Sequence, residues 1–139
     1  MKLKNICYIA VILSLFSQSV FADKNTEKNT ITYQNTRGSI LKLSINSDNT
    51  LTGFFTTAVA SKECQQAIGV KRPIVGYITK NALTFSVNYP ECGVLTFIGN
   101  IEDNQKIIDT MAIVAHSSNH IAKEGPGARM ISHDVFNRV

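Results

Sequence analysis

The sequence predicts an all-β protein, an eight-stranded antiparallel up-and-down β-barrel. Three observations lead to this prediction. Short runs rich in Thr, Ile, Val, Phe and Tyr recur along the chain, turn residues separate them, and no segment shows a sustained apolar period of 3.6 residues. Strands joined by tight turns form a meander, and closure into a barrel removes the exposed edge strands. The interior of such a barrel can hold one small ligand.

The first residues have the pattern of a secretory signal peptide over residues 1–22. Lys2 and Lys4 precede the short apolar run Ile6–Phe16, and the small residue Ala22 provides a cleavage site. The apolar run is too short to cross a bilayer comfortably. We therefore expect an exported protein, secreted or periplasmic, with no membrane association after cleavage; a retained N-terminal anchor is the alternative.

The chain that remains after this cleavage has 117 residues (139 − 22), enough for one core and one domain. Residues 23–29 are polar and are expected to form a flexible N-terminus, followed by the barrel domain over residues 30–139. Without Lys2 and Lys4, 12 basic residues (14 − 2) face 10 acidic ones. The Lys and Arg residues are scattered, so no basic stripe indicates nucleic-acid binding.

Turn residues such as Arg37-Gly38 and Lys80-Asn81 separate eight expected strands. Two longer loops are expected at Ala60–Lys71 and Ser117–Gly127. The expected strands, in order, are Thr30–Thr36, Ser39–Ile45, Thr50–Val59, Ile74–Thr79, Ala82–Tyr89, Val94–Ile101, Ile107–His116 and Arg129–Arg138.

Alternation along each strand predicts which side chains face the interior. In the second strand Leu41 and Leu43 must point inward, so Ser44 is expected to face water. The polar residues with inward parity near strand ends are Ser39, Thr57 and Asp134. A buried polar side chain is costly unless it is paired, and a satisfied core network explains any one of them. Three on separate strands at one end favour a ligand pocket with a few placed polar groups.

No pattern of catalytic residues is present, so an enzyme and a bound cofactor are not expected. The sequence has no Gly-x-Ser-x-Gly elbow, no Cys–His nucleophile pair and no phosphate-binding loop. His116 and His120 are four residues apart, but they fall in an expected loop, and a metal site is not predicted there. Cys64 and Cys92 are an even pair in an exported chain, which favours a disulfide over two free thiols.

Four segments in order resemble the avidin and streptavidin family over almost all of the expected mature chain. Tyr33–Ser39 is similar to the opening W-x-N-x-x-G-S, and Leu51–Val59 is similar to T-G-x-Y-x-[ST]-A-V. Phe85–Tyr89 is similar to F-x-V-x-W, and Ser132–Val139 is similar to the closing G-x-[DN]-x-F-x-[RK]-[VL]. The cysteine pair resembles the disulfide of dimeric, rhizavidin-like bacterial avidins.

The resemblance implies biotin binding in the barrel interior. It implies that Asn35 and Ser39 donate to the ureido oxygen, and that Thr57 and Asp134 accept from the ureido N–H groups. It also implies that Ser61 meets the carboxylate of the ligand, where the neighbouring Lys62 would add a cation, and that Thr96 presents a hydroxyl to the ring sulfur. The remaining positions of the implied site are Phe55, Tyr89 and Phe97.

The chain departs from the family at the aromatic walls, because it has no tryptophan. Phe55 stands in place of a tyrosine donor, and the loss of one buried donor costs about 1–3 kcal/mol. Tyr89 and Phe97 replace two indoles, Ala112 replaces a third, and Pro126 falls near a fourth. An aromatic-to-Ala change forfeits about 3–5 kcal/mol. Biotin–streptavidin lies near the ceiling of about −18 to −21 kcal/mol, so we expect binding that is weaker than in typical avidins.

Two alternatives stay open: an avidin-like barrel that binds a different small ligand or a peptide, and an exported inhibitor or interaction protein. The last two strands also carry outward apolar residues, which more often mark an interface than bare surface. We therefore expect a homodimer or a higher homo-oligomer. The outward apolar residues are Met111, Ile113, Ile131 and Val135.

Overall fold

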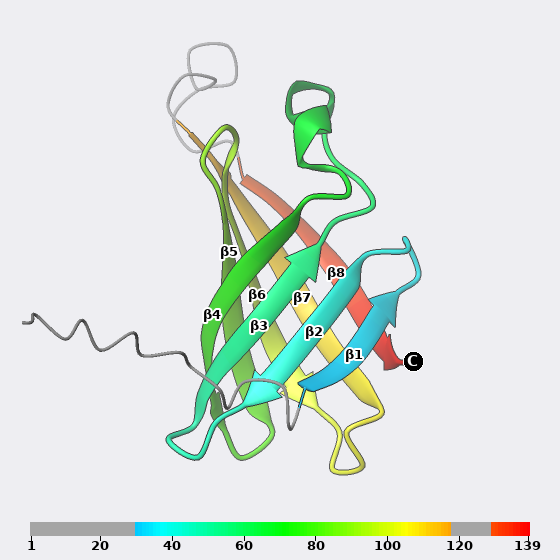
Figure 1. Ribbon diagram of the computed structural model, residues 1–139, viewed down its shortest axis with the longest axis vertical. Coiled ribbons are helices and arrows are strands. Elements are labelled where there is room, and N and C mark those ends of the chain that lie inside the picture. The colour runs from blue at the N-terminus through cyan, green and yellow to red at the C-terminus, as the bar shows by residue number, and fades with distance from the viewer. Residues whose placement is uncertain (1–29, 118–128) are drawn as a thin grey trace, which may run out of the picture.

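The computed structural model describes residues 30–117 and 129–139, which form a closed barrel with the strand order β1 to β8 (Figure 1). Each strand pairs antiparallel with the next, and β1 pairs with β8 to close the barrel through contacts such as Asn35 with Phe136. The predicted eight-stranded antiparallel up-and-down barrel is therefore confirmed. The strands are β1 Thr30–Asn35, β2 Ile40–Ile45, β3 Thr50–Thr56, β4 Lys71–Thr79, β5 Ala82–Tyr89, β6 Gly93–Ile101, β7 Ile107–His116 and β8 Arg129–Arg138.

The expected loop between β3 and β4 differs from its prediction at both ends. β3 ends at Thr56 rather than at Val59, and β4 begins at Lys71 rather than at Ile74. The loop contains a short 3-10 helix, η1 (Lys62–Ala67). Pro73 lies inside β4, where it pairs with Phe54 of β3, while the pairing with β5 begins only at Ile74. This first part of β4 is therefore paired on one side only, and such an edge position tolerates a residue without a backbone N–H.

Inward side chains of all eight strands fill the barrel with an apolar core. Phe97 lies at its centre, stacked on Phe85 with ring centroids 4.7 Å apart and in edge contact with Phe55 and Phe136 at 5.3 and 5.4 Å. Such offset and edge contacts add to the burial of the rings. The phenylalanine cluster thus provides a rigid interior in a chain without tryptophan.

Ser44 does not face water as alternation predicts. It has the outward parity in β2, but it is buried, and its hydroxyl lies 2.7 Å from that of Thr30 at the start of β1. Thr30 and Ser44 are opposite each other in the β1–β2 ladder. The cross-strand partner satisfies the hydroxyl, so that it tolerates burial.

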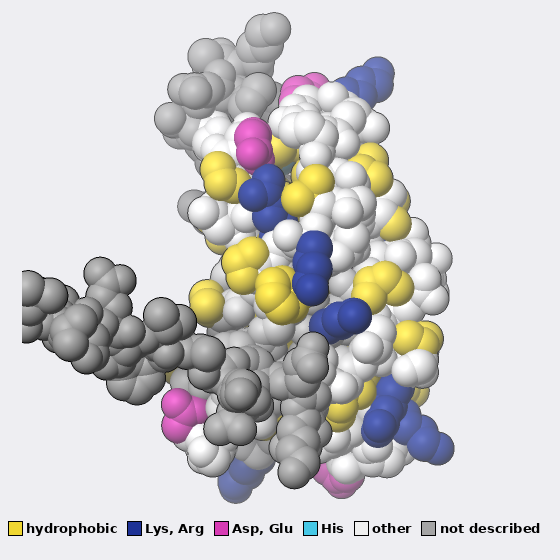
Figure 2. All heavy atoms as spheres, in the orientation of Figure 1, with side chains coloured by type: hydrophobic (Ala, Val, Ile, Leu, Met, Phe, Trp, Pro, Cys, Tyr) yellow, Lys and Arg dark blue, Asp and Glu magenta, His cyan; other side chains and the backbone are white. Residues whose placement is uncertain are grey.

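The β1–β2, β3–β4 and β5–β6 connections lie at one end of the barrel, and η1 projects beyond that end (Figure 1). A disulfide joins Cys64 of η1 to Cys92 in the β5–β6 turn, with the two Cα atoms 5.9 Å apart. The predicted disulfide is confirmed. On the face drawn in Figure 2, Lys and Arg side chains are interspersed with hydrophobic ones. Within the described residues, no helix has the length and apolar character needed to cross a membrane.

Candidate functional site

A cavity of about 410 Å³ opens at the barrel end that carries η1. Its size suits one small ligand. All eight residues predicted for the site line it, although they come from five strands and two connections of the chain: Asn35, Ser39, Phe55, Thr57, Ser61, Tyr89, Phe97 and Asp134.

The β1–β2 turn orients Asn35 at the polar side of the cavity. Its amide oxygen accepts hydrogen bonds from the backbone N–H groups of Arg37 at 3.1 Å and Ser39 at 2.8 Å, and the turn passes through Gly38 at φ +89°. The backbone at Gly38 is one that other residues rarely adopt. With the oxygen occupied, the amide nitrogen donates one hydrogen to Asp134 at 3.1 Å. Its second hydrogen takes no acceptor among the described residues and is available to a ligand.

The hydroxyl of Ser39 is free to donate a hydrogen bond to a ligand, whereas that of Thr57 is free to accept one. The oxygen of Ser39 accepts the N–H of Ala58 at 3.0 Å, so its proton remains free to donate. The hydroxyl of Thr57 donates to the carbonyl of Val59 at 2.6 Å and accepts the N–H of Val59 at 3.3 Å. The proton of Thr57 is therefore used, and its second lone pair is left to accept a hydrogen bond.

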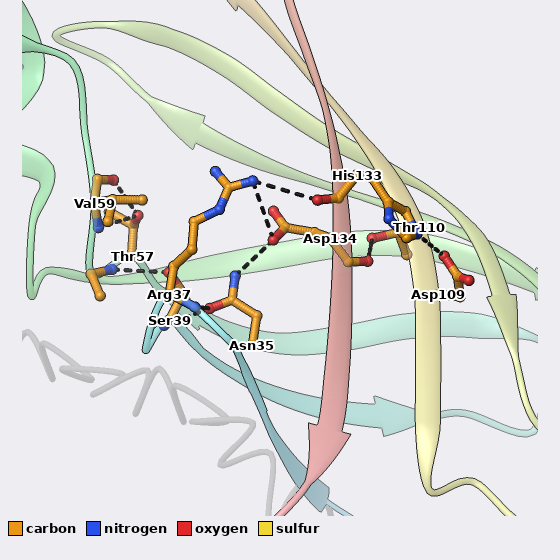
Figure 3. A network of polar contacts seen from close by, with 10 residues as sticks. Asn35, Arg37, Ser39, Thr57, Val59, Asp109, Thr110, His133 and Asp134 are labelled. Atoms are coloured by element: carbon orange, nitrogen blue, oxygen red, sulfur yellow. Dashed lines mark hydrogen bonds and ion pairs between the residues drawn. The ribbon is translucent and has the colours of Figure 1, made fainter.

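Asp134 is a buried carboxylate on β8 whose described contacts all go to one oxygen. Oδ1 accepts from Asn35 and lies 3.6 Å from the guanidinium of Arg37, as Figure 3 shows. The hydroxyl of Thr110 on β7 donates to the Asp134 carbonyl at 2.9 Å and so holds this part of β8 in place. Oδ2 receives no hydrogen bond from the residues that the structure describes, and it remains an acceptor for a ligand.

The polar side of the cavity therefore offers two donors and two acceptors. The donors are the amide of Asn35 and the hydroxyl of Ser39; the acceptors are Thr57 Oγ1 and Asp134 Oδ2. A carbonyl oxygen flanked by two N–H groups would satisfy all four at once. This arrangement fits a cyclic urea or a similar amide better than a plain apolar ligand.

Apolar side chains form the remaining walls. Phe55 and Phe97 are almost completely buried and belong to the phenylalanine cluster. Ala112 lies opposite Phe97 in the β6–β7 ladder, and Leu95 is on the same face of β6 as Phe97. These walls contain no indole, and Ala112 contributes only a methyl group to them.

The rim of the cavity is held by the disulfide. Ser61 lies just before η1 and Tyr89 ends β5, and both hydroxyl oxygens are buried without a hydrogen-bond partner among the described residues. Burial raises the pKa of Tyr89 to about 12, against a smaller opposing effect of the nearby Arg72 charge. The Tyr89 hydroxyl is therefore protonated, and a donor, at neutral pH.

Two expectations about individual residues are wrong. Thr96 does not line the cavity, because it has the outward parity in β6 and its hydroxyl bonds to that of Ser86 at 2.8 Å. Leu95 takes the inward place, so the cavity has an apolar wall there. Lys62 is exposed and does not line the cavity either.

The cation that sequence reasoning missed is Arg37, which lines the cavity and also donates to the carbonyl of His133 at 3.4 Å. Its place in the turn between Asn35 and Ser39 was the available signal. His116 lines the cavity as well, whereas His120, Pro126 and the expected signal peptide lie outside the described residues. Among the described residues, no group of three or more His, Cys, Asp or Glu side chains could hold a metal ion.

Comparison with known proteins identifies the family of the chain. The profile described as the Avidin family matches residues 23–139. The chain belongs to the avidin family. Avidin-family proteins are non-catalytic, as expected for a chain with no catalytic pattern, and biotin is a ligand for them rather than a cofactor. No curated protein matches the sequence.

Solved structures of this family share the barrel. The bradavidin2–biotin complex is 26% identical with a TM-score of 0.65, and the match covers 80% of this chain and 97% of that one. A shwanavidin variant in complex with biotin is 23% identical with a TM-score of 0.64, covering 80% and 96%. The rhizavidin–biotin complex is 20% identical with a TM-score of 0.64, covering 79% and 99%. The predicted resemblance to the avidin family, with rhizavidin among its structural relatives, is confirmed.

Proposed function

We propose that the protein binds biotin without catalysis in the cavity at the η1 end of the barrel. The observation that carries the proposal is the set of two free donors and two free acceptors on Asn35, Ser39, Thr57 and Asp134. It is complementary to a ureido group. Membership of the avidin family and the biotin complexes of similar barrels support the same ligand.

The affinity is expected to lie below that of typical avidins. Phe55 has no hydroxyl to serve as a third donor, Leu95 has no polar group, and Ala112 offers less contact area than an aromatic residue would. One lost donor costs about 1–3 kcal/mol, and a large aromatic replaced by Ala forfeits about 3–5 kcal/mol. Against a ceiling of about −18 to −21 kcal/mol, losses of about 4–8 kcal/mol leave about −10 to −17 kcal/mol, which corresponds to a dissociation constant between about picomolar and tens of nanomolar.

Isothermal titration of biotin into the disulfide-bonded domain over residues 23–139 tests the proposal. We expect a 1:1 complex per chain, and biotin at about 100 times its dissociation constant should add about 2.7 kcal/mol to the stability. Absence of both heat and a thermal shift at about 100 μM biotin would contradict the proposal.

A second candidate is a different cyclic urea or amide, which the space beside Ala112 favours. The two candidates share the polar side of the cavity and differ at the apolar wall. Competition between biotin and bulkier cyclic ureas separates them: preference for the bulkier compounds would identify the second. Asn35→Ala and Asp134→Ala should abolish either kind of binding, whereas a partner-binding function on the outer surface would survive both changes.

We propose that the protein is exported. The apolar run Ile6–Phe16 with its flanking residues supports this proposal, and so does the Cys64–Cys92 disulfide, because disulfides persist in oxidising compartments. N-terminal sequencing of the protein recovered from its native cells is the test. A mature N-terminus at Asp23 is expected, and an intact Met1 would contradict export by this route.

We also propose a homodimer through the outer face of β6 to β8. In the ladders, Met111 lies between Ile98 and His133, and Ile113 lies between Thr96 and Ile131. Ile98 is 54% exposed and Ile131 is 64% exposed, so together with Met111 and Ile113 they place an apolar patch on this face. Light scattering at about 10 μM should find a dimer that Ile131→Lys dissociates; a monomeric native protein would contradict the proposal.

A further inference from the structure

We propose that Arg37 is a specificity-determining residue of the cavity, whose positive charge makes the polar side accept a neutral cyclic urea and reject a cationic ring of the same shape. The inference rests on the proposed function and deepens it, because it concerns the same bound ring. It starts from one feature of this chain, a guanidinium placed beside the carboxylate that is free to accept from the ligand.

Arg37 contacts two residues of the polar side of the cavity. Its backbone N–H donates to the Asn35 amide oxygen at 3.1 Å, and its guanidinium lies 3.6 Å from Oδ1 of Asp134 (Figure 3). The guanidinium also donates to the His133 carbonyl at 3.4 Å, which ties it to β8. The turn that orients Asn35 therefore also places a cation against Asp134.

The formal charges on the described part of the cavity wall balance each other. Apart from His116, the described ionisable residues that line the cavity with a full charge are the Asp134 carboxylate and the Arg37 guanidinium. A carboxylate without a nearby cation would attract a cationic ligand, because a hydrogen bond between charged groups is about twice as strong as a neutral one. Here the protein itself provides the cation. The polar side therefore matches an uncharged ring.

A cationic ring at the same place would be repelled. A cyclic guanidinium has an NH₂ group where the urea has its oxygen, and it carries a full positive charge at neutral pH, as the arginine side chain does. When its ring N–H donates to Oδ2 of Asp134, it lies across a single carboxylate group from the Arg37 guanidinium. The Arg37 side chain is 42% exposed and partly screened, so we expect this repulsion to weaken binding about 10-fold.

Arg37→Gln tests the proposal, because it removes the charge and keeps a polar side chain in the turn. Competition titration at neutral pH compares biotin with its cyclic guanidine analogue. The two ligands share the side chain, so contacts outside the ring cancel in the ratio of their dissociation constants. The native protein should prefer biotin, and Arg37→Gln should reduce this preference about 10-fold. Arg37→Lys keeps the charge and should preserve the preference within about 2-fold.

Lys42→Gln is the matched control, since it removes the same charge from an exposed residue of β2 and should leave the preference unchanged. The donors of Asn35 and Ser39 also disfavour the NH₂ group of the analogue, but they do so equally in every variant. If Arg37→Gln weakens both ligands by the same factor, or changes neither, the proposal is overturned. An equal loss of preference in Arg37→Lys would overturn it as well, since the charge would not be the cause.

Ring fragments separate this proposal from the biotin proposal. If the native protein binds no biotin, the biotin proposal fails, and ethyleneurea and its cyclic guanidinium counterpart then decide the role of Arg37. Each is added at high millimolar concentration while NMR follows the side-chain amide signals of Asn35. The cationic fragment should shift these signals more in Arg37→Gln than in the native protein, whereas ethyleneurea should shift them similarly in both. Equal shifts by the cationic fragment in the two proteins would overturn the role of Arg37.

Discussion

Asp134→Asn is the most direct test of the polar side of the cavity. The substitution keeps the shape of the side chain, removes its charge and replaces one oxygen by an NH₂ group. The amide oxygen can keep the contact with Asn35 only if the NH₂ group takes the place of Oδ2. A donor would then face the N–H group of the ligand. The opposite orientation brings the NH₂ group against the donors of Asn35 and Arg37.

The structure sets the magnitude of each effect. A hydrogen bond to a charged group contributes about 1.5–3 kcal/mol, so the dissociation constant for biotin should rise about 10- to 150-fold. The effect on folding should be much smaller. The Arg37 side chain that pairs with Asp134 is 42% exposed, and such screened ion pairs contribute about 0–1 kcal/mol. The melting temperature should therefore fall by about 8 °C at most.

Isothermal titration and thermal melting of the same samples measure the two effects. Asp109→Asn is the matched control, because Asp109 lies on the neighbouring strand, is 63% exposed and contacts His133 on the outer face. It should not change the affinity for biotin. If Asp134→Asn binds biotin within about 3-fold of the native protein, the carboxylate is not the acceptor for the ligand and the reasoning is refuted.

Three further predictions concern the wall, the rim and the interior. Phe55→Tyr should strengthen biotin binding about 10-fold by restoring a third donor, measured by competition; unchanged affinity would show that the ring does not point its para position at the ligand. Reduction of the Cys64–Cys92 disulfide, which closes a separation of 28 residues, should cost about 3 kcal/mol in unfolding experiments with and without reductant, and a cost near zero would contradict the expected role of the cross-link. Burial raises the pKa of Tyr89 to about 12 and also raises that of Tyr33. The folded state therefore holds these protons more tightly than the unfolded chain. The stabilising contribution of Tyr89 is complete below the unfolded pKa of about 10 and is lost as the pH rises towards 12. Melts over this range should show a shallower decline for Tyr89→Phe than for the native protein, and parallel curves would refute the assignment.

The strands and most of the site could be predicted because their signals are local. Alternation places Leu41 and Phe85 inside, and the same rule places Thr57 and Asp134 at the cavity. The rule would also have placed Leu95 rather than Thr96 inside, had it been counted back from Phe97. Thr96 was expected at the cavity because the segment between Tyr89 and Phe97 is short. A family pattern matched across this β5–β6 turn can be shifted by one residue, which exchanges inward and outward positions.

Amino-acid order by itself determined the alternation of inward and outward side chains along each strand, the turn residues and the types of polar groups available to a ligand. These features depend only on neighbours in the chain. Only the tertiary structure decided which of those groups remain free. The Arg37 guanidinium contacts the Asp134 carboxylate where β1 pairs with β8, and the Ser44 hydroxyl bonds to that of Thr30. The disulfide holds the segment that contains Ser61 at the cavity that Tyr89 also lines. The first and third contacts join segments far apart in sequence, and the second needs β1 and β2 to pair in register. Their hydrogen bonds and burial therefore exist only once the strands have paired.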